Sequence, residues 1–192
     1  MSDYPRKYER VGDAPYALTV AESDEPTWDG AAHDALSLIF SASNIMGDAD
    51  LEWLRIALNK FIDQNMLPNK KAPKVPGMSE PTLTAITWAN IGAMAIKIAA
   101  QREEQFNIRE VHQTVVRKQR DYGPENIRRF GRGGLLIRMH DKVARLENLL
   151  NLDGGGKPNN ESIRDNLMDV VGYSCVAIMW EMETFLLPLR QV

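Results

Sequence analysis

Cysteine is almost absent from this chain of 192 residues, which excludes two common means of stabilising a fold. A single cysteine, Cys175, allows neither an internal disulfide nor a cluster of cysteine metal ligands. It lies in the apolar run VVGYSCVAIMW, which predicts a buried and unreactive thiol. The fold must therefore rest on an apolar core, and 192 residues are enough to bury one.

Long hydrophobic runs are also missing. We find no stretch of about 18 apolar residues, and the N-terminal sequence MSDYPRKYERVGD lacks the apolar segment of a signal peptide. We therefore expect a cytoplasmic protein with no membrane partner. The net charge of -3 does not predict general binding to nucleic acid, and we expect no direct contact with it.

The charges that are present are distributed unevenly. Nine acidic and two basic residues lie between residues 22 and 63, whereas nine basic and three acidic residues lie between residues 117 and 145. An anionic ligand would be attracted to the second of these segments.

Helical periodicity dominates the sequence, and no segment is convincing as a strand. We predict an all-α bundle of about six helices, at residues 27–46, 49–65, 79–103, 108–121, 135–151 and about 160–187. The second helix has its apolar side at Leu51, Leu54, Ile56, Leu58, Phe61 and Ile62. Residues 1–27 read as an irregular arm, 28–105 as helices packing on the core, and 106–192 as the helical core itself.

Several residues predict where these helices begin and end. Asp48 and Ser79 are suitable N-caps for the second and third helices, and either Asn159 or Asn160 for the sixth. Tyr122-Gly123-Pro124 should end the fourth helix. We expect residues 125–134 to form a basic connection with at most a short helical turn. Its sequence Gly-Arg-Gly-Gly, residues 131–134, precedes a helix and could offer N–H groups to a phosphate.

A row of carboxylates marks the start of the sixth helix, in Asn160–Tyr173. Glu161, Asp165 and Asp169 are four residues apart, so in one helix they would lie on the same face. The repulsion between like charges at this spacing favours a bound cation, either a basic side chain or a metal ion.

The fifth helix offers a matching polar face formed by Arg138, Asp141, Arg145 and Asn148. If the two helices pack antiparallel, Asp141 approaches Asp165 and Asp169. Oxygen ligands on rigid helices suit Mg²⁺ or Mn²⁺. Phosphate groups would bind the nearby basic side chains, which are Lys118, Arg138, Lys142 and Arg145. From spacing alone, these residues are also compatible with simple ion pairs in a bundle, either Asp141 with Arg145 or Asp165 with Arg138 or Arg145.

Two segments of the chain resemble the phage-enriched nucleotide-modification-associated family. They are VHQTVVRKQRDYGPENIRRFGRGGLLIRMHDKVARLENLL and NNESIRDNLMDVVGY. That family is similar to the MazG-like all-α nucleotide pyrophosphohydrolases. The resemblance covers about residues 110–179 and rests on a combination of positions: Lys118, Asp121-Tyr122-Gly123, Arg138, Asp141-Lys142, Arg145-Leu146, Asn148, Asp165, Asp169 and Tyr173.

The resemblance implies an enzyme that cleaves a (deoxy)nucleoside triphosphate into a monophosphate and pyrophosphate, in phage or bacterial nucleotide metabolism. Its magnesium ligands would be Asp141, Glu161, Asp165 and Asp169, of which the three aspartates orient the attacking water. The substrate-binding residues would be Lys118, Tyr122, Arg138, Lys142, Arg145, Asn148 and Tyr173. Tyr122 could stack on a base, and Tyr173 could bind an acidic ligand or the nucleotide.

The chain departs from the ExxE and ExxD motifs of the MazG-like group. Its first helix offers Asp141 without ExxE, and its second offers Asn166-Leu-Met-Asp169 in place of ExxD. A second hypothesis is therefore a module that binds a nucleotide without cleaving it, and a third is a structural helical subunit. MazG-like proteins are commonly dimers or tetramers, so we expect a homo-oligomer, with the arm at residues 1–27 as a candidate exchanged element.

Overall fold

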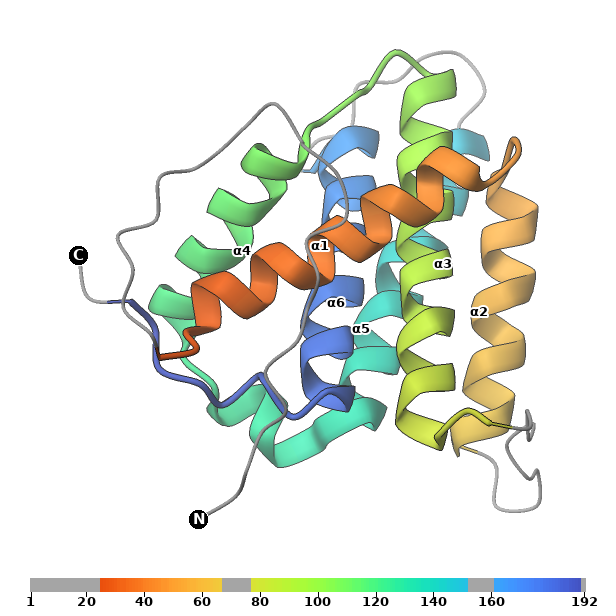
Figure 1. The fold of residues 1–192 in the computed structure, drawn as a ribbon. Helices are drawn as coiled ribbons and strands as arrows, with labels where there is room; N and C mark the ends of the chain where they lie inside the picture. Colours follow the sequence, from red (N-terminus) through yellow and green to blue (C-terminus); the bar gives the residue numbers. More distant parts are fainter. Residues whose placement is uncertain (1–24, 67–76, 152–160, 191–192) are drawn as a thin grey trace.

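The structure, a computed structural model, describes residues 25–66, 77–151 and 161–190. These ranges contain six α-helices and no strand, which confirms the all-α prediction (Figure 1). The helices are α1 (Trp28–Ile45), α2 (Leu51–Met66), α3 (Glu80–Gln101), α4 (Ile108–Tyr122), α5 (Glu125–Asn151) and α6 (Ile163–Glu181). The expected arm falls almost entirely outside the described residues.

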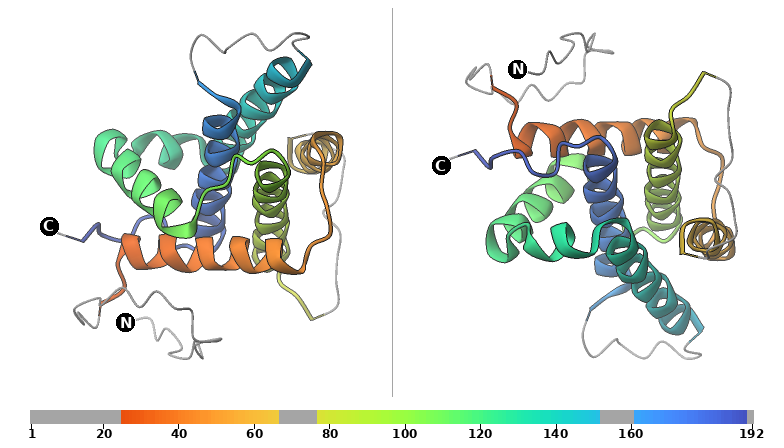
Figure 2. Two further views of the ribbon diagram at one scale, coloured as in Figure 1. Left: turned by 90° about the horizontal axis from the view of Figure 1, so that it is seen from above. Right: turned by 90° about the horizontal axis from the view of Figure 1, so that it is seen from below.

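The centre of the bundle is the pair α3 and α6, which pack extensively against each other. α1 crosses α3, α6 and α4 on one side (Figures 1 and 2). α5 packs on α6, and α2 packs on α5 and α3 at the edge of the molecule. This arrangement places α4, α5 and α6 next to one another, which are the helices that carry the predicted site residues.

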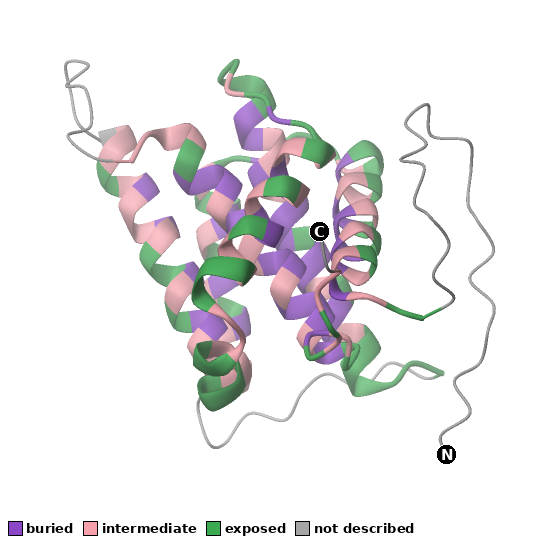
Figure 3. Ribbon diagram, turned by 90° about the vertical axis from the view of Figure 1, so that its left-hand side faces the viewer, coloured by how far each residue is buried: buried purple, intermediate pink, exposed green. Residues whose placement is uncertain are grey.

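All six helices contribute to one buried apolar cluster, including residues on both sides of the predicted boundary near residue 105 (Figure 3). Trp28 and Trp88 are fully buried within it. Gly92 of α3 lies where helices come very close: a Cβ added there would be 2.8 Å from Ile39 Cγ2 and 3.1 Å from Ser174 Cβ. The small residues of α3 thus allow α1 and α6 to approach it.

One finding qualifies the sequence-based expectation about membranes. By length and composition alone, α3 is long and apolar enough to cross a bilayer. Its apolar residues include Ala85, Trp88, Ile91 and Ile98, all of which are buried against neighbouring helices. Core helices of globular domains also pass such a test.

The helix boundaries follow side-chain caps. Thr27, Ser79 and Asn107 each accept a hydrogen bond from a backbone N–H in the first turn of α1, α3 and α4. The expected cap at Asp48 is wrong, because Asp50 Oδ1 accepts the N–H of Trp53 at 2.8 Å and α2 begins at Leu51. The later start does not change which residues of α2 share a helix face. Ile56 was predicted to face the core but is exposed.

The expected connection at residues 125–134 is helical instead. α5 begins at Glu125 directly after Pro124 and bends at Gly131, whose φ of 52° and ψ of -143° interrupt the helix. The bend brings the Gly131 backbone against Trp180, since an added Cβ would lie 3.2 Å from Trp180 Cζ2. Gly131–Gly134 therefore lie at the bend of α5, where two helical segments meet.

The sixth helix is shorter than predicted. Ser162, rather than Asn159 or Asn160, caps α6, and the helix ends at Glu181 rather than near Leu187. After it, Glu183 has φ of 58°, and the N–H groups of Glu183 and Thr184 return to the carbonyl oxygens of Trp180 and Met179. These paired bonds form a Schellman motif, which ends the helix.

Candidate functional site

Three contacts show that α5 and α6 pack antiparallel, which is the condition on which the expected site depended. Arg132 pairs with Glu181 at one end, Lys142 with Asp169 in the middle, and Arg145 with Glu161 at the other end. Residue numbers rise along α5 as they fall along α6. The basic face of α5 therefore lies beside the acidic residues of α6 and of its preceding turn.

Asp169 is the centre of the site. Its carboxylate forms ion pairs with the ammonium groups of Lys118 from α4 and Lys142 from α5, and Lys142 Nζ is 2.7 Å from Oδ2. The Asp169 side chain is only 14% exposed. A carboxylate this well covered needs a cation, because an unpaired buried charge is strongly unfavourable. Here two basic side chains from two helices meet that need.

Lys142 joins Asp169 to a second carboxylate. Its Nζ is 2.7 Å from Glu161 Oε2 as well as 2.7 Å from Asp169 Oδ2. Burial lowers the pKa of Lys142, but the two carboxylates outweigh burial and hold that pKa above its ordinary value. Glu161 also lies 3.5 Å from Arg145 Nη1.

These contacts form a chain of alternating charge: Lys118, Asp169, Lys142, Glu161 and Arg145. We call it the lysine–carboxylate chain. Three positive and two negative groups leave a local charge of +1. Lys118, Glu161 and Arg145 remain partly exposed, so an anion in solution can reach the positive groups.

Glu161, Asp165 and Asp169 do not form the expected row on one helix face. Glu161 precedes the Ser162 cap and lies outside the helix. Asp165 forms a capping box: its Oδ2 accepts the Ser162 N–H at 3.0 Å and hydroxyl at 2.8 Å. These bonds from Ser162 hold the pKa of Asp165 below its ordinary value. Within the described ranges, no group of three or more acidic, histidine or cysteine side chains is arranged to hold a metal ion.

The other predicted site residues are scattered. Asp141 and Asn148 are exposed on α5, and Arg138 is partly exposed. No hydrogen bond or ion pair joins Asp141 to Asp165 or Asp169; the next residue, Lys142, makes the contact expected of Asp141. The alternative ion pairs of Asp165 with Arg138 or Arg145 are also not formed.

The two candidate tyrosines have different surroundings. Tyr173 is partly buried and packs against the core. Tyr122 is 77% exposed at the end of α4, one helical turn after Lys118, where an aromatic ring is open to a ligand.

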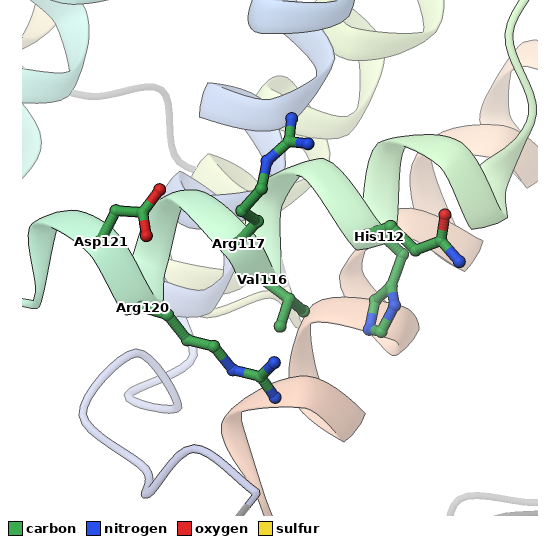
Figure 4. A pocket seen from close by; sticks show the side chains of 6 residues that line it. His112, Val116, Arg117, Arg120 and Asp121 are labelled. Atoms are coloured by element: carbon green, nitrogen blue, oxygen red, sulfur yellow. The ribbon is translucent and has the colours of Figure 1, made fainter. Parts of the chain in front are cut away.

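The structure also contains a hollow that we did not predict from the sequence. It has a volume of about 280 Å³ and lies along α4, lined by His112, Gln113, Val116, Arg117, Arg120 and Asp121 (Figure 4). His112 hydrogen-bonds through Nε2 to the carbonyl oxygen of Asp29 at 2.8 Å, so this imidazole links α4 to α1. The i, i+4 spacing of His112, Val116 and Arg120 was the signal for this face.

Comparisons with known proteins add no further assignment: no family model, no curated protein and no solved structure matches this chain. The function must therefore be argued from the geometry of the site and from the residues that carry the resemblance.

Proposed function

We propose that this protein binds the phosphate groups of a (deoxy)nucleotide at Lys118, Lys142 and Arg145. The observation that carries the proposal is the convergence of these three cations, from α4 and α5, on the two carboxylates Asp169 and Glu161. Basic side chains held at one place by rigid helices are suited to a polyanion, and arginine binds phosphate oxygens in pairs.

The free-energy cost of releasing the more exposed cations, Lys118 and Arg145, to a ligand is small. Ion pairs between partly exposed groups contribute only about 0–1 kcal/mol each, because water and salt screen them. A triphosphate brings more negative charge than the two carboxylates. It can therefore compete for Lys118 and Arg145, whose side chains are open to solvent, without the loss of a buried structural pair.

Two further features support a nucleotide rather than phosphate alone. The residues of the site belong to the segments that resemble the nucleotide-modification-associated family. Tyr122, exposed one turn from Lys118, is positioned so that its ring can stack on a base. Tyr173, which packs against the core, has a structural role in this proposal.

A second candidate function, pyrophosphate release from a (deoxy)nucleoside triphosphate, is favoured by the position of Lys142. Its ammonium group lies 2.7 Å from both Glu161 and Asp169, so these two carboxylates already face one cation. Magnesium in nucleotide enzymes is often held by one or two carboxylates together with substrate phosphates, and it supplies charge stabilisation at the reacting phosphate. Asp169 and Glu161 would be its protein ligands, and Asp141 and Asp165 would not.

Ligand-induced stabilisation tests the binding proposal. A panel of nucleotides and inorganic tripolyphosphate is added to the protein, and the melting temperature is measured. A ligand at 100 times its Kd should stabilise the fold by about 2.7 kcal/mol, which corresponds to a rise of about 5–11 °C for a protein of this size. The Lys118→Met/Lys142→Met variant should lose this rise, whereas Lys97→Met on α3 should keep it.

The proposal fails if no member of the panel raises the melting temperature of the wild type, or if the double variant responds as the wild type does. Circular dichroism checks that both variants are folded.

Hydrolysis is tested separately, by assaying pyrophosphate release from the same nucleotides with Mg²⁺ or Mn²⁺. Asp169→Asn should abolish release while the variant still binds tripolyphosphate. Binding by the wild type without turnover of any nucleotide would reject the enzyme and leave the binding module.

A further inference from the structure

The outer face of α2 carries two large apolar side chains in solvent. Trp53 is 65% exposed and Ile56 is 53% exposed, whereas Leu54, Leu58 and Phe61 of the same helix are buried against α3 and α5. α2 lies at the edge of the bundle, so its outer side is directed away from the other helices (Figure 2). Two large apolar side chains exposed on one helix face are suited to a contact with another apolar surface.

The exposed face has a regular spacing. Trp53, Ile56 and Lys60 are separated by three and four residues, so they form a single line along the helix. Glu52 adjoins this line, and its carboxylate, also paired with Arg55 of the same helix, stays open to solvent. The face therefore has an apolar middle, a negative group toward its N-terminal end and a positive group toward its C-terminal end.

We propose that this face binds the same face of a second copy of the chain, with the two α2 helices antiparallel about a two-fold axis near Ile56. In this register Ile56 meets Ile56 of the second copy. Glu52 then lies opposite Lys60 of the second copy, and Lys60 opposite its Glu52. The pairing is isologous and closed, as two-fold symmetry requires.

The order of charges selects this partner and this direction. A parallel pairing would set Glu52 against Glu52 and Lys60 against Lys60, which like-charge repulsion disfavours. In the antiparallel pairing each Trp53 indole also lies beside Lys60 of the second copy, where a cation–π contact is possible. Of the parallel and antiparallel pairings, only the antiparallel one thus places opposite charges together.

The size of the face sets the expected strength. A helix of 16 residues is about 24 Å long, so a pair of such helices buries less than the roughly 800 Å² per partner of a standard interface. The dimer should therefore be reversible, with a Kd of about micromolar or weaker.

Sedimentation velocity of the full chain, at concentrations from about 5 to 500 µM, tests the proposal. The wild type should shift from monomer to dimer with concentration. Lys60→Glu and Glu52→Lys should each weaken dimerisation about 10-fold or more, because each places like charges opposite one another twice. The double variant Glu52→Lys/Lys60→Glu restores opposite charges and should return the Kd to within about 3-fold of the wild type.

Arg109→Glu, an exposed charge reversal on α4, is the matched control and should not change the Kd. Trp53 fluorescence provides a second reading: acrylamide quenching should fall as the dimer forms, measured as the difference from Trp53→Phe. A monomer at every concentration overturns the proposal. So does a dimer that is insensitive to the single reversals, that the double variant does not restore, or whose Trp53 quenching does not change.

Discussion

Replacing Glu181 with glutamine should destabilise the bundle more than replacing either of the other two acidic residues of α6 with its amide. Glu181 is a carboxylate at the end of α6 whose side chain is 4% exposed. Arg132 donates to it twice, from Nε at 2.7 Å and from Nη2 at 2.6 Å, and the pKa of Arg132 is raised by these bonds with Glu181. Arg132 Nη1 also donates to Asn65 at 2.9 Å, so the pair connects α2, α5 and α6.

The magnitude follows from what remains after the change. Breaking a fully buried ion pair typically costs about 3–5 kcal/mol, because the other charge is left without its partner. Arg132 is 29% exposed and keeps Asn65, and Glu80 lies 3.7 Å away, so we expect a smaller loss of about 2–3 kcal/mol. That loss lowers the melting temperature by about 4–12 °C for a chain of this size.

Urea unfolding followed by circular dichroism measures the loss, with Glu183→Gln, an exposed residue two positions later, as the matched control. A double-mutant cycle with Arg132→Met should give a coupling of at least about 1 kcal/mol. A loss below about 0.5 kcal/mol for Glu181→Gln, or a coupling near zero, would show that this pair does not hold the helices together.

Three other predictions concern the helix contacts and caps. Gly92→Ala should lower the free energy of unfolding by about 1–3 kcal/mol, because the added Cβ would meet Ile39 and Ser174. Gly133→Ala should raise it by up to about 1 kcal/mol, because the Cβ added there meets nothing within 4 Å. Urea unfolding that ranks the two variants in the opposite order contradicts the packing described. Glu183→Gly should raise the melting temperature by about 1–4 °C, because φ is 58° at that position and glycine adopts it without strain; a fall in calorimetry would count against this. The capping box of Asp165 and Ser162 should stabilise the protein fully above the unfolded pKa of Asp165, 3.8, and progressively less as pH falls through its lower folded pKa. Ser162→Ala should therefore lower the free energy of unfolding by about 1 kcal/mol at pH 7 and by less near pH 3. An equal loss at both pH values would show that the stabilisation by this cap does not depend on the charge of Asp165.

The helices and the core were predictable because both depend on local periodicity. Leu54, Leu58 and Phe61 are buried where the helical spacing placed them, and Ser79 and Gly123 mark boundaries through their own chemistry. The error at residues 125–134 has a physical cause. Gly131 is tolerated within α5 because the backbone must approach Trp180, a contact between residues 49 positions apart that local sequence does not reveal.

The candidate site was predicted only in part, for a related reason. The opposition of a basic face on α5 and an acidic face on α6 followed from spacing, and Lys118, Lys142 and Asp169 do meet. The partner of Asp169 depends on the rotation of α5 about its axis, and one residue turns a helix by about 100°. That rotation brings Lys142, rather than Asp141, to Asp169.

The position of the α6 N-cap determines whether the three carboxylates lie on one helix face. Asn159, Asn160 and Ser162 are all suitable N-caps. The choice of Ser162 moves Glu161 out of the helix and assigns Asp165 to the backbone of the first turn. A shift of two residues in one boundary thus changes a possible three-carboxylate cluster into two site carboxylates, Asp169 and Glu161, and one cap, Asp165.

The most direct test of the phosphate site is the affinity of Asp169→Asn for inorganic tripolyphosphate, measured calorimetrically in metal-free buffer and compared with that of the wild type. Because Asp169 competes with phosphate for Lys118 and Lys142, its neutral replacement should tighten binding about 5-fold, or about 1 kcal/mol for one unit charge at about 4 Å in a water-like medium. Weaker binding by a folded variant, or no binding by either protein, would contradict the proposal that these lysines receive phosphate.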